Sequence, residues 1–379
     1  MTSPTVLCYH CGRAVDLPQK GWKPGEKAYC SHHHLLVGTD PWVIGQEAID
    51  YAEWMHDLQP DELVRWPWQA VNDLAGPLAP GRLTYLAAFP GGGKTTFLTH
   101  CLYYWLAEGK TVTYLPLESD PGEVFVRLAC LEIGASADDA LSYRLAERKA
   151  AGDVMAQQIH ENLTRAYRAF RDRRALLESL RILPIPSLTV KSFTKAVAVA
   201  EAMESDLIVV DHVDHVESDV GEHASEIHVS NALQAEALKA AKRLSIPVVL
   251  ATQLNSSRTG NDRLAHYRPP STDWLYNKGK KEQMAANILG LSRVMRAGVP
   301  SDWVSEVRAG LRPVQDVVLD NRMAVTGMKL RYGGGMKERT VQLAYEHGRI
   351  VDLDAGDLRD TMAQRHGVLL GSPSNRRRD

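Results

Sequence analysis

The residue types and spacing best suited to chemistry lie in residues 83–97, which read LTYLAAFPGGGKTTF. An apolar run leads into a glycine cluster, Lys94 and Thr95 follow, and an apolar, helix-favouring segment comes next. This order of strand, glycine-rich loop and helix is typical of a phosphate-binding P-loop. Glycines without a Cβ let backbone N–H groups face a polyphosphate, and the helix N-terminus adds partial positive charge. The predicted binding positions are Ala88, Pro90, Gly91, Gly92, Gly93, Lys94, Thr95 and Thr96.

The polar side chains of this loop have expected roles toward a nucleoside triphosphate. Lys94 would supply a cation for the β and γ phosphates, the Thr95 hydroxyl would ligate Mg²⁺, and Thr96 would reach the α phosphate. The generic pattern has glycine at its first position, where this sequence has Ala88. The alternative is a glycine-rich surface turn that happens to precede Lys-Thr. The apolar strand before the loop and the helix after it favour the P-loop.

Three further polar residues stand where apolar strands end. Glu118 follows TVTYLPL, Asp211 ends LIVVD, and Gln253 ends IPVVLATQ. The carboxyl ends of parallel strands are where α/β sheets place their ligands. Glu118 could therefore polarise an attacking water, Asp211 could hold the Mg²⁺ shell, and Gln253 could touch the γ phosphate. The alternatives are a solvated strand-end acid and a simple strand-end amide.

The N-terminal segment carries two pairs of potential metal ligands. Cys8 and Cys11 form a C-x-x-C pair, and Cys30 and His33 form a C-x-x-H pair after a polar loop. Such thiolate and imidazole ligands can close a tetrahedron around Zn²⁺, which would supply folding energy to a segment too short for a core. His34 can take the place of His33. The alternative is a set of unligated cysteines beside a run of histidines.

A basic and aromatic segment spans residues 256–281. Its Gly, Ser and Pro content predicts a mobile loop, and its aromatic residues could stack on the bases of a single-stranded nucleic acid. A plain surface loop can have the same composition, so this alternative stays open. The candidate nucleic-acid contacts are Arg258, Arg263, Arg268, Lys278, Lys280 and Lys281.

Two cations alternate on a strand near the C-terminal end of the sequence. Lys329 and Arg331 lie on one face of that strand, and the glycines at 333–335 predict a hairpin turn. Cations projecting beside a tight turn could reach a nucleotide on a neighbouring subunit.

These positions require a parallel sheet with helices on its faces, so the predicted fold class is α/β. The apolar runs ending at Asp211 and Gln253 suit strands buried on both faces. Helices are expected at 193–203 and 225–244, and a short strand at 181–186. The expected organisation is a zinc-binding module over 1–38, a helical linker over 39–65, an α/β domain over 66–355 and a flexible tail over 356–379. The linker holds an amphipathic segment at 46–58, which packs on its own domain or docks on a neighbouring subunit.

Composition excludes several classes of protein. The chain has 379 residues, 44% of them hydrophobic and 24% charged, with a net charge of -2 and a sequence pI of about 6.7. There is no global basic field, so any nucleic-acid binding needs a local basic surface. No apolar run approaches the roughly 18 residues that span a bilayer, and no secretory signal is expected. Five cysteines do not make a disulfide scaffold, which indicates a reducing cytoplasm.

Together these stretches resemble the RecA-like motor domain of DnaB-type replicative helicases, over about Trp66–Asp352. AAFPGGGKTTF is similar to the P-loop of that family, which commonly has Ala first, and LPLESD is similar to its catalytic glutamate segment. LIVVDHVDHV, LKAAKRLSIPVVLATQLN and MKLRYGGG resemble its Walker B strand, its sensor strand and its Lys-x-Arg finger segment. The resemblance places Arg127 as the arginine of the helix after the glutamate. Asn287 stands where the family tends to have an acid.

The resemblance implies an ATP-hydrolysing helicase that uses Mg²⁺, with a P-loop NTPase core. In that role Glu118, Lys94, Asp211 and Gln253 would serve the subunit's own nucleotide, and Arg331 with Lys329 a neighbour's. The implied assembly is a hexameric ring on single-stranded DNA in the cytoplasm of a bacterial or phage-infected cell.

The sequence also departs from that family. The helical collar domain is not expected, and the zinc module stands in its place, which suggests a phage or mobile element as the source and a primase or loader as the module's partner. One alternative is a RecA-like ATPase that binds DNA without unwinding it, as a loader, switch or recombination mediator. A more distant alternative is a zinc-dependent adaptor with a degenerate nucleotide site.

Overall fold

The computed structural model describes residues 5–7, 14–16 and 62–353, except for 136, 142, 173–177, 215, 219–225, 260–263, 297, 332–339 and 347–348. The chain divides into two compact units, Met1–Glu62 and Leu63–Asp379. In the first unit the described residues form two antiparallel strands, β1 (Thr5–Leu7) and β2 (Ala14–Asp16). Outside the described residues lie the predicted zinc ligands Cys8, Cys11, Cys30, His33 and His34, the expected helix at 46–58, the glycines at 333–335 and the expected tail.

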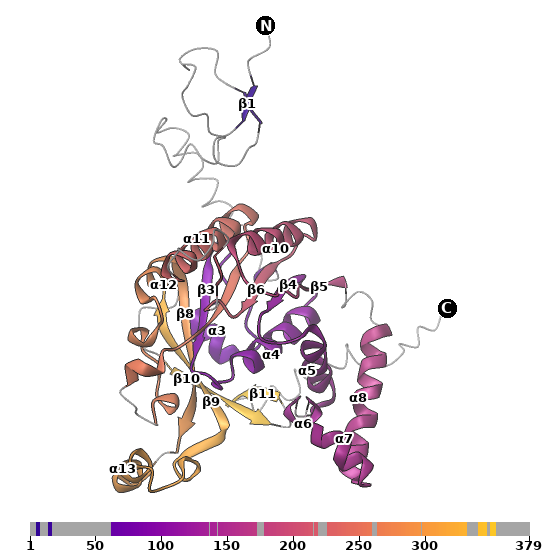
Figure 1. Ribbon diagram of the computed structural model, residues 1–379, viewed down its shortest axis with the longest axis vertical. Helices are drawn as coiled ribbons and strands as arrows, with labels where there is room; N and C mark the ends of the chain where they lie inside the picture. Colours follow the sequence, from indigo (N-terminus) through magenta and orange to yellow (C-terminus); the bar gives the residue numbers. More distant parts are fainter. Residues whose placement is uncertain are drawn as a thin grey trace, which may run out of the picture. The chain divides into compact units, whose positions relative to one another are not determined.

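Within its described residues, the second unit is built on a nine-stranded sheet in the order β11-β10-β9-β8-β3-β7-β6-β4-β5 (Figure 1). Neighbouring strands from β8 to β5 are parallel, and β9, β10 and β11 continue the sheet as an antiparallel meander. The strands are β3 (Leu83–Ala88), β4 (Val112–Pro116), β5 (Leu180–Ile182), β6 (Leu207–Asp211), β7 (Val248–Gln253), β8 (Ala285–Met295), β9 (Val318–Leu330), β10 (Thr340–Glu346) and β11 (Arg349–Asp352).

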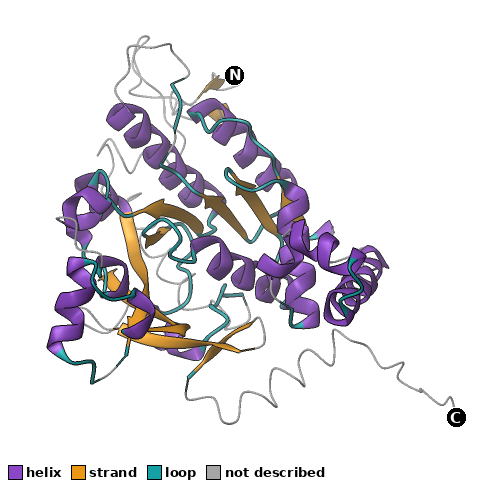
Figure 2. Ribbon diagram, turned by 60° about the horizontal axis from the view of Figure 1, so that its bottom comes forward, coloured by secondary structure: helices purple, strands orange, loops and turns teal. Residues whose placement is uncertain are grey.

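Helices cover both faces of the parallel half of this sheet (Figure 2). The α-helices are α3 (Gln69–Ala75), α4 (Lys94–Ala107), α5 (Pro121–Ile133), α6 (Ala137–Leu141), α7 (Tyr143–Ala150), α8 (Val154–Asp172), α10 (Val190–Ala202), α11 (Glu226–Leu244), α12 (Lys278–Met284) and α13 (Ser301–Ala309). Four 3₁₀ helices are also described, at Ser256–Thr259, Ala265–Tyr267, Thr272–Trp274 and Val314–Asp316.

The two-sided cover explains the continuous apolar runs in the sequence. On β3, Leu86 and Ala88 belong to the core formed with α4 and α5, whereas Tyr85 and Ala87 belong to the core formed with α10 and α11. All six residues of β3 are buried. A central parallel strand therefore needs apolar side chains on both faces. The α/β fold with a mostly parallel sheet, predicted from the sequence, is confirmed.

The first helix and the last described strand of the second unit contact each other. The Asp352 carboxylate accepts hydrogen bonds from the backbone N–H groups of Gln69 (2.8 Å) and Ala70 (3.2 Å) at the start of α3. Trp68 donates its indole N–H to the Ile350 carbonyl at 2.9 Å. Asp352 thus acts as the cap of α3, where Trp68 offers no side-chain acceptor.

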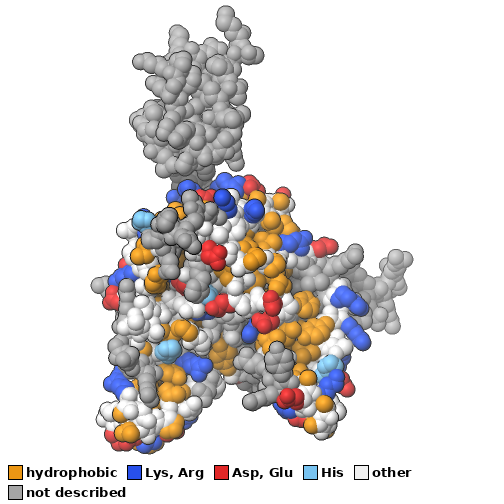
Figure 3. Space-filling view, viewed as in Figure 1, with side chains coloured by type: hydrophobic (Ala, Val, Ile, Leu, Met, Phe, Trp, Pro, Cys, Tyr) orange, Lys and Arg blue, Asp and Glu red, His pale blue; other side chains and the backbone are white. Residues whose placement is uncertain are grey.

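No described helix is long and apolar enough to cross a bilayer. Lysine, arginine and acidic side chains are interspersed over the face seen in Figure 3, as the near-zero net charge leads one to expect. A helical insertion that the sequence did not predict, α13, lies between β8 and β9.

The sheet order decides which loops can form a site. β4, β6, β7 and β3 are consecutive neighbours and parallel, so their carboxyl ends meet along one side of the sheet. We call this side, with the loops that follow these four strands, the carboxyl edge. It holds the P-loop and the three strand-end residues predicted from the sequence.

Candidate functional site

The P-loop connects β3 to α4, and its glycines adopt conformations that other residues resist. Gly93, directly before α4, has φ +88°, in the left-handed region that favours glycine. A Cβ on Gly92 would lie 2.8 Å from the Phe89 carbonyl oxygen, and the Gly92 N–H donates to that same oxygen at 2.9 Å. The loop therefore makes a tight turn between Phe89 and Gly92. Since its glycines carry no side chains, the loop backbone stays accessible beside the start of α4.

The first residue of α4 is Lys94, which is only 7% exposed. Burial lowers the pKa of its ammonium group, and the nearby carboxylates of Asp211, Glu118 and Asp214 oppose that shift. These acids come from the ends of β4 and β6, so the cation and the carboxylates share the carboxyl edge. An ammonium group held this way suits a polyphosphate, which brings its own negative charge.

Asp211 ends β6 and is 2% exposed. Burial raises the pKa of its carboxyl group, and a hydrogen bond from the Thr95 side chain and the Lys94 charge lower it in turn. Tyr114 donates its hydroxyl to Asp211 Oδ2 at 3.2 Å, while Oδ1 is buried without a hydrogen-bond partner among the described residues. A hydroxyl in contact with a carboxylate that has a spare buried oxygen fits the preference of Mg²⁺ for oxygen ligands. The residues present therefore fit Mg²⁺.

Glu118 lies two residues beyond β4, and its side chain is half exposed. Its Oε1 lies 3.4 Å from His212 Nδ1 and 3.5 Å from Gln253 Nε2. The Gln253 amide also donates to His212 Nε2 at 3.2 Å, so the proton of a neutral His212 sits on Nδ1, which faces Glu118. Burial lowers the pKa of His212 and favours this neutral form. Gln253 and His212 therefore lie beside one oxygen of Glu118, and the carboxylate stays half exposed to solvent.

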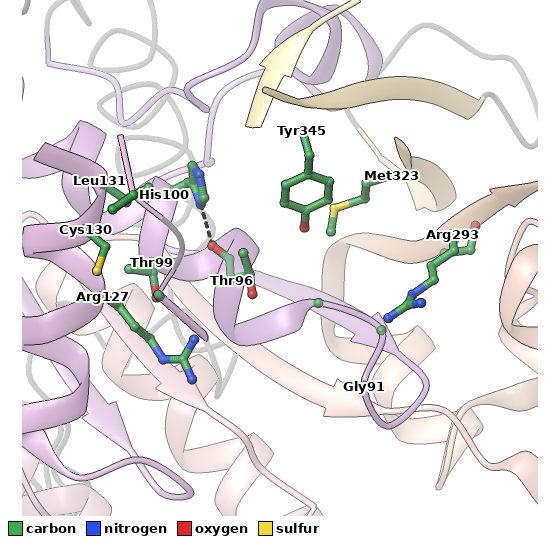
Figure 4. A pocket seen from close by; sticks show the side chains of 15 residues that line it. Gly91, Thr96, Thr99, His100, Arg127, Cys130, Leu131, Arg293, Met323 and Tyr345 are labelled. Carbon is green, nitrogen blue, oxygen red and sulfur yellow. Dashed lines mark hydrogen bonds between the residues drawn. The ribbon is translucent and has the colours of Figure 1, made fainter. Parts of the chain in front are cut away.

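A cavity of about 430 Å³ adjoins the P-loop (Figure 4). Tyr345 of β10 and Met323 of β9 project into it from the antiparallel half of the sheet, and Arg293 of β8 reaches toward Gly91. Arg127 of α5 lines the opposite wall. We call this space the base-side cavity. It pairs an aromatic ring with two guanidinium groups next to a phosphate loop.

A family model described as "DnaB-like helicase C terminal domain" matches residues 66–329. The chain belongs to this family. A solved structure of a DnaB-like replicative helicase, reported with its interactions with primase, is 17% identical over 87% of this chain and 68% of that one, with a TM-score of 0.59. A second solved structure, of an isolated ATPase domain, is 18% identical over 82% of this chain and 99% of that one, with a TM-score of 0.60. No curated protein sequence matches the chain.

In this DnaB-like chain, Lys329 and Arg331 differ in their surroundings. Lys329 of β9 donates its ammonium group to the carbonyls of Glu282 and Ala285 (2.9 Å for Ala285), at the C-terminal end of α12. Arg331, just beyond β9, is exposed. The two cations lie near each other, since burial, with a contribution from the charge of Arg331, lowers the pKa of Lys329. Arg331 faces solvent, and Lys329 binds carbonyls of its own subunit.

The segment 256–281 is also less uniform than a mobile basic loop. Its described part folds into three 3₁₀ helices and the start of α12. Lys281 is fully buried, which removes it from any surface that a nucleic acid could contact. Lys280 is exposed, and Lys278 forms an ion pair with Asp273 at 2.6 Å. Arg263 and the side chain of Arg258 lie outside the described residues, and Arg268 is partly exposed.

Sequence reasoning missed the cavity residues that come from β8 and from the antiparallel strands β9 and β10. Tyr345, Met323 and Arg293 lie on strands whose return to the P-loop depends on the sheet order. The basic Arg293 among apolar residues of β8 was the one local signal. His212 and Asp214 follow Asp211 in the sequence, and no role in the network around Gln253 was predicted for them.

Proposed function

We propose that the chain is an ATP-dependent DNA helicase of the DnaB type, which hydrolyses ATP between the subunits of a homo-oligomeric ring and moves along single-stranded DNA. The observation that supports it best is the gathering of Lys94, Thr95, Glu118, Asp211 and Gln253 on one carboxyl edge, in a chain of the DnaB-like family. Family membership supports the helicase class, and the residues on this edge support the proposed chemistry.

ATP would lie across the P-loop, with its phosphates on the backbone N–H groups at the start of α4. The base and ribose would enter the base-side cavity, where the Tyr345 ring offers a stacking surface and the Arg293 guanidinium a second one. Arg127, on the far wall, has its Nε buried without a hydrogen-bond partner among the described residues. A ribose or phosphate oxygen would satisfy that donor.

Hydrolysis would begin with a water held by Glu118, whose half-exposed carboxylate can accept the water's proton. As the water oxygen bonds to the γ phosphorus, the bond from that phosphorus to the β–γ bridging oxygen would break, and ADP and inorganic phosphate would leave. His212 and Gln253 lie beside Glu118 Oε1, so the other oxygen would face the water. Lys94 would stabilise the charge on the transferred phosphoryl group. Mg²⁺, when bound by Thr95 and Asp211, neutralises phosphate charge there.

Completion of the site would come from a second copy of the chain. Arg331 is exposed and lies at the end of β9 that pairs with the start of β8, on the side of the sheet opposite the carboxyl edge, so it would serve the nucleotide of a neighbour. Such head-to-tail contacts close into a ring, for which we propose six subunits. Gln253, in contact with Glu118, would respond to the presence of the γ phosphate.

For the first unit we propose a zinc ion held by Cys8, Cys11, Cys30 and His33, with a primase or a loader as the partner of the module. Metal analysis of the purified protein tests the ion. About one zinc per chain, lost in Cys8→Ser with Cys11→Ser, is expected. Purified protein without zinc contradicts this part and leaves the ATPase untouched.

The decisive experiment for the whole proposal is strand displacement on a forked DNA duplex with ATP and Mg²⁺. Wild type should unwind it, and Lys94→Ala and Arg331→Ala should not. A mixture of the two variants should recover part of the activity, because each supplies the group that the other lacks. Lys239→Met, which removes an exposed lysine of α11, is the matched control.

Two other outcomes would contradict unwinding. DNA-stimulated hydrolysis that needs Lys94 but displaces no strand would favour a loader, switch or recombination mediator. No turnover with or without DNA would favour an adaptor.

A further inference from the structure

A second buried lysine lies behind the carboxyl edge. Lys281 of α12 is 0% exposed, and its Nζ lies 3.0 Å from Asp214 Oδ1 and also donates to Thr252 Oγ1. Asp214 follows β6 by three residues, and Thr252 is the penultimate residue of β7. The ion pair therefore joins α12 to the ends of two central strands. We call it the Asp214–Lys281 link.

The strand-side half of the link holds the backbone of Gln253. The Gln253 N–H donates to Asp214 Oδ2, and the Thr252 hydroxyl donates to Asp214 Oδ1 at 2.6 Å. Gln253 in turn places its side-chain amide between Glu118 and His212. Asp214 thus contacts the main chain of the residue that touches the proposed catalytic base.

On the other side of the link, α12 contacts the end of β9, which carries Lys329 and is followed by Arg331. One residue after Lys281, the Glu282 carbonyl accepts a hydrogen bond from Lys329, as does the Ala285 carbonyl at 2.9 Å. Two residues beyond Lys329, the Arg331 backbone N–H donates to the Ala286 carbonyl at 3.1 Å. The end of β9 is therefore fastened to the end of α12, and α12 is fastened to Gln253 by the link.

Burying an ion pair between α12 and the ends of β6 and β7 does not by itself favour folding. Removing two charges from water costs free energy, and apolar residues of the same volume pack as well or better. Burial lowers the pKa of Lys281, and Asp214 opposes the shift. Hydrogen bonds have a preferred direction, and those of the link join defined atoms of β7 to α12. A pair of apolar residues would not fix that relative position.

We propose that the Asp214–Lys281 link is a positioning element that passes displacements of Gln253 through α12 to Arg331. The nucleotide bound to one subunit would then set the position of that subunit's Arg331 in the site of its neighbour. This inference rests on the proposed function, since it assumes that Gln253 faces a γ phosphate and that Arg331 acts on a neighbour. Lys281 and Asp214 are positioning residues in this scheme, and neither touches the nucleotide.

The test follows backbone hydrogen exchange in the full chain with and without ATPγS and Mg²⁺. In wild type, the nucleotide should slow exchange at the P-loop and also change it in residues 278–284 and 329–331. In Lys281→Met/Asp214→Asn, which removes both charges and so leaves none buried alone, the P-loop change should remain and the change at α12 and β9 should vanish. Lys239→Met should behave as wild type.

Kinetics supply the second readout. The double variant should lose about tenfold in kcat for ATP with its KM unchanged within about twofold. Mixing it with Lys94→Ala, whose finger and link are intact, should raise the rate above that expected for simple dilution, because the defect lies in the finger given to the neighbour.

Three results would overturn the inference. Persistence of the α12 and β9 changes in the double variant would show that the link carries no displacement. A rise in KM in place of a fall in kcat would assign the link to nucleotide binding. An absence of recovery in mixed rings would confine its effect to its own subunit. Failure of the proposed function would look different, because wild type would then show no change at the P-loop or no hydrolysis.

Discussion

Two regions of the second unit each bury a lysine, and they hold it in opposite ways. Lys94, at the P-loop, is 7% exposed and forms no ion pair within the described part of the chain. Lys281, behind β7, is 0% exposed and paired with Asp214 at 3.0 Å. Burial lowers the pKa of both ammonium groups. The Lys94 ammonium group is thus left without a direct ion-pair partner among the described residues, whereas the Lys281 ammonium group is bound to the Asp214 carboxylate.

We therefore expect Lys94 to serve a ligand and Lys281 to serve the Asp214–Lys281 link. An ammonium group with carboxylates nearby but no direct partner gains most when a phosphate arrives. An ammonium group in a buried pair gains nothing from a ligand, and its loss leaves Asp214 without its cation. The two lysines should therefore fail differently when replaced, and the predictions below test that difference.

The largest effect is expected for Lys94→Ala. Removing the cation that meets the phosphates should lower kcat/KM for ATP by about 10³-fold or more, since both binding and charge stabilisation are lost. Steady-state phosphate release with single-stranded DNA measures it. Retention of more than a tenth of the wild-type rate would mean that Lys94 is not the phosphate cation.

Lys281→Met should have the largest effect on stability. Because it leaves a largely buried carboxylate with neutral hydrogen-bond donors only, from Thr252 and Gln253, we expect the free energy of unfolding to fall by about 3 kcal/mol. Urea unfolding followed by circular dichroism measures it, and Lys94→Met is the matched variant. The free energy of unfolding of Lys94→Met should not fall, because no paired acid loses its partner. Equal losses in both variants would erase the distinction drawn between the two lysines.

Glu118→Gln should slow hydrolysis by about 10²- to 10³-fold, because the amide cannot accept the proton of the attacking water. Binding of a fluorescent ATP analogue should change little, since Glu118 is half exposed and lies beyond the P-loop. Single-turnover hydrolysis together with a binding titration separates the two quantities. A loss of binding equal to the loss of rate would remove Glu118 from the role of base.

A smaller effect is expected on the base side. Tyr345→Ala should raise the KM for ATP about 5- to 100-fold, in line with the loss of one aromatic stacking partner, while kcat stays near wild type. Tyr345→Phe keeps the ring and should keep the KM. If both variants bind ATP as wild type does, the base lies elsewhere.

The smallest effect concerns pH. His266 stacks on Phe89 beside the P-loop with ring centroids 4.4 Å apart, and burial, with a contribution from Arg293, lowers its pKa below 6.5. Because the unfolded chain then binds the proton more readily, the contribution of His266 is complete above pH 6.5. It is lost as the pH falls from 6.5 through the folded pKa. The urea midpoint should therefore drop slightly more between pH 7.5 and pH 5.5 in the wild type than in His266→Phe. Identical pH profiles would contradict the shift.

The parts of the fold that the sequence predicted are those encoded locally. The P-loop is one contiguous run, and Asp211 and Gln253 each end an apolar strand whose burial on both faces is written in its composition. Given parallel strands, their carboxyl ends had to lie on one side of the sheet. The roles of these residues remain predictions, since the structure gives their places and not their chemistry.

The parts that the sequence did not predict depend on distant segments. Tyr345 lies near the P-loop because β10 pairs antiparallel with β9. No local sequence pattern predicts that pairing. Lys281 belongs to a segment whose composition indicates a solvated surface, and only the position of Asp214 behind β7 explains its burial. Lys329 lies near Arg331, but the binding of its ammonium group by the carbonyls at the end of α12 was not predicted.

The junction between Trp68 and Asp352 has a consequence for how such a unit can be rearranged. Because the last described strand, β11, caps the first helix of the unit, α3, residues 68–70 and 350–352 hold each other in place. A covalent joint across this junction would close the unit into a loop, which could be reopened in the turn between α7 and α8 at Gly152 without touching the carboxyl edge. We expect that a segment joined to the chain at this junction would leave the geometry of the carboxyl edge unchanged.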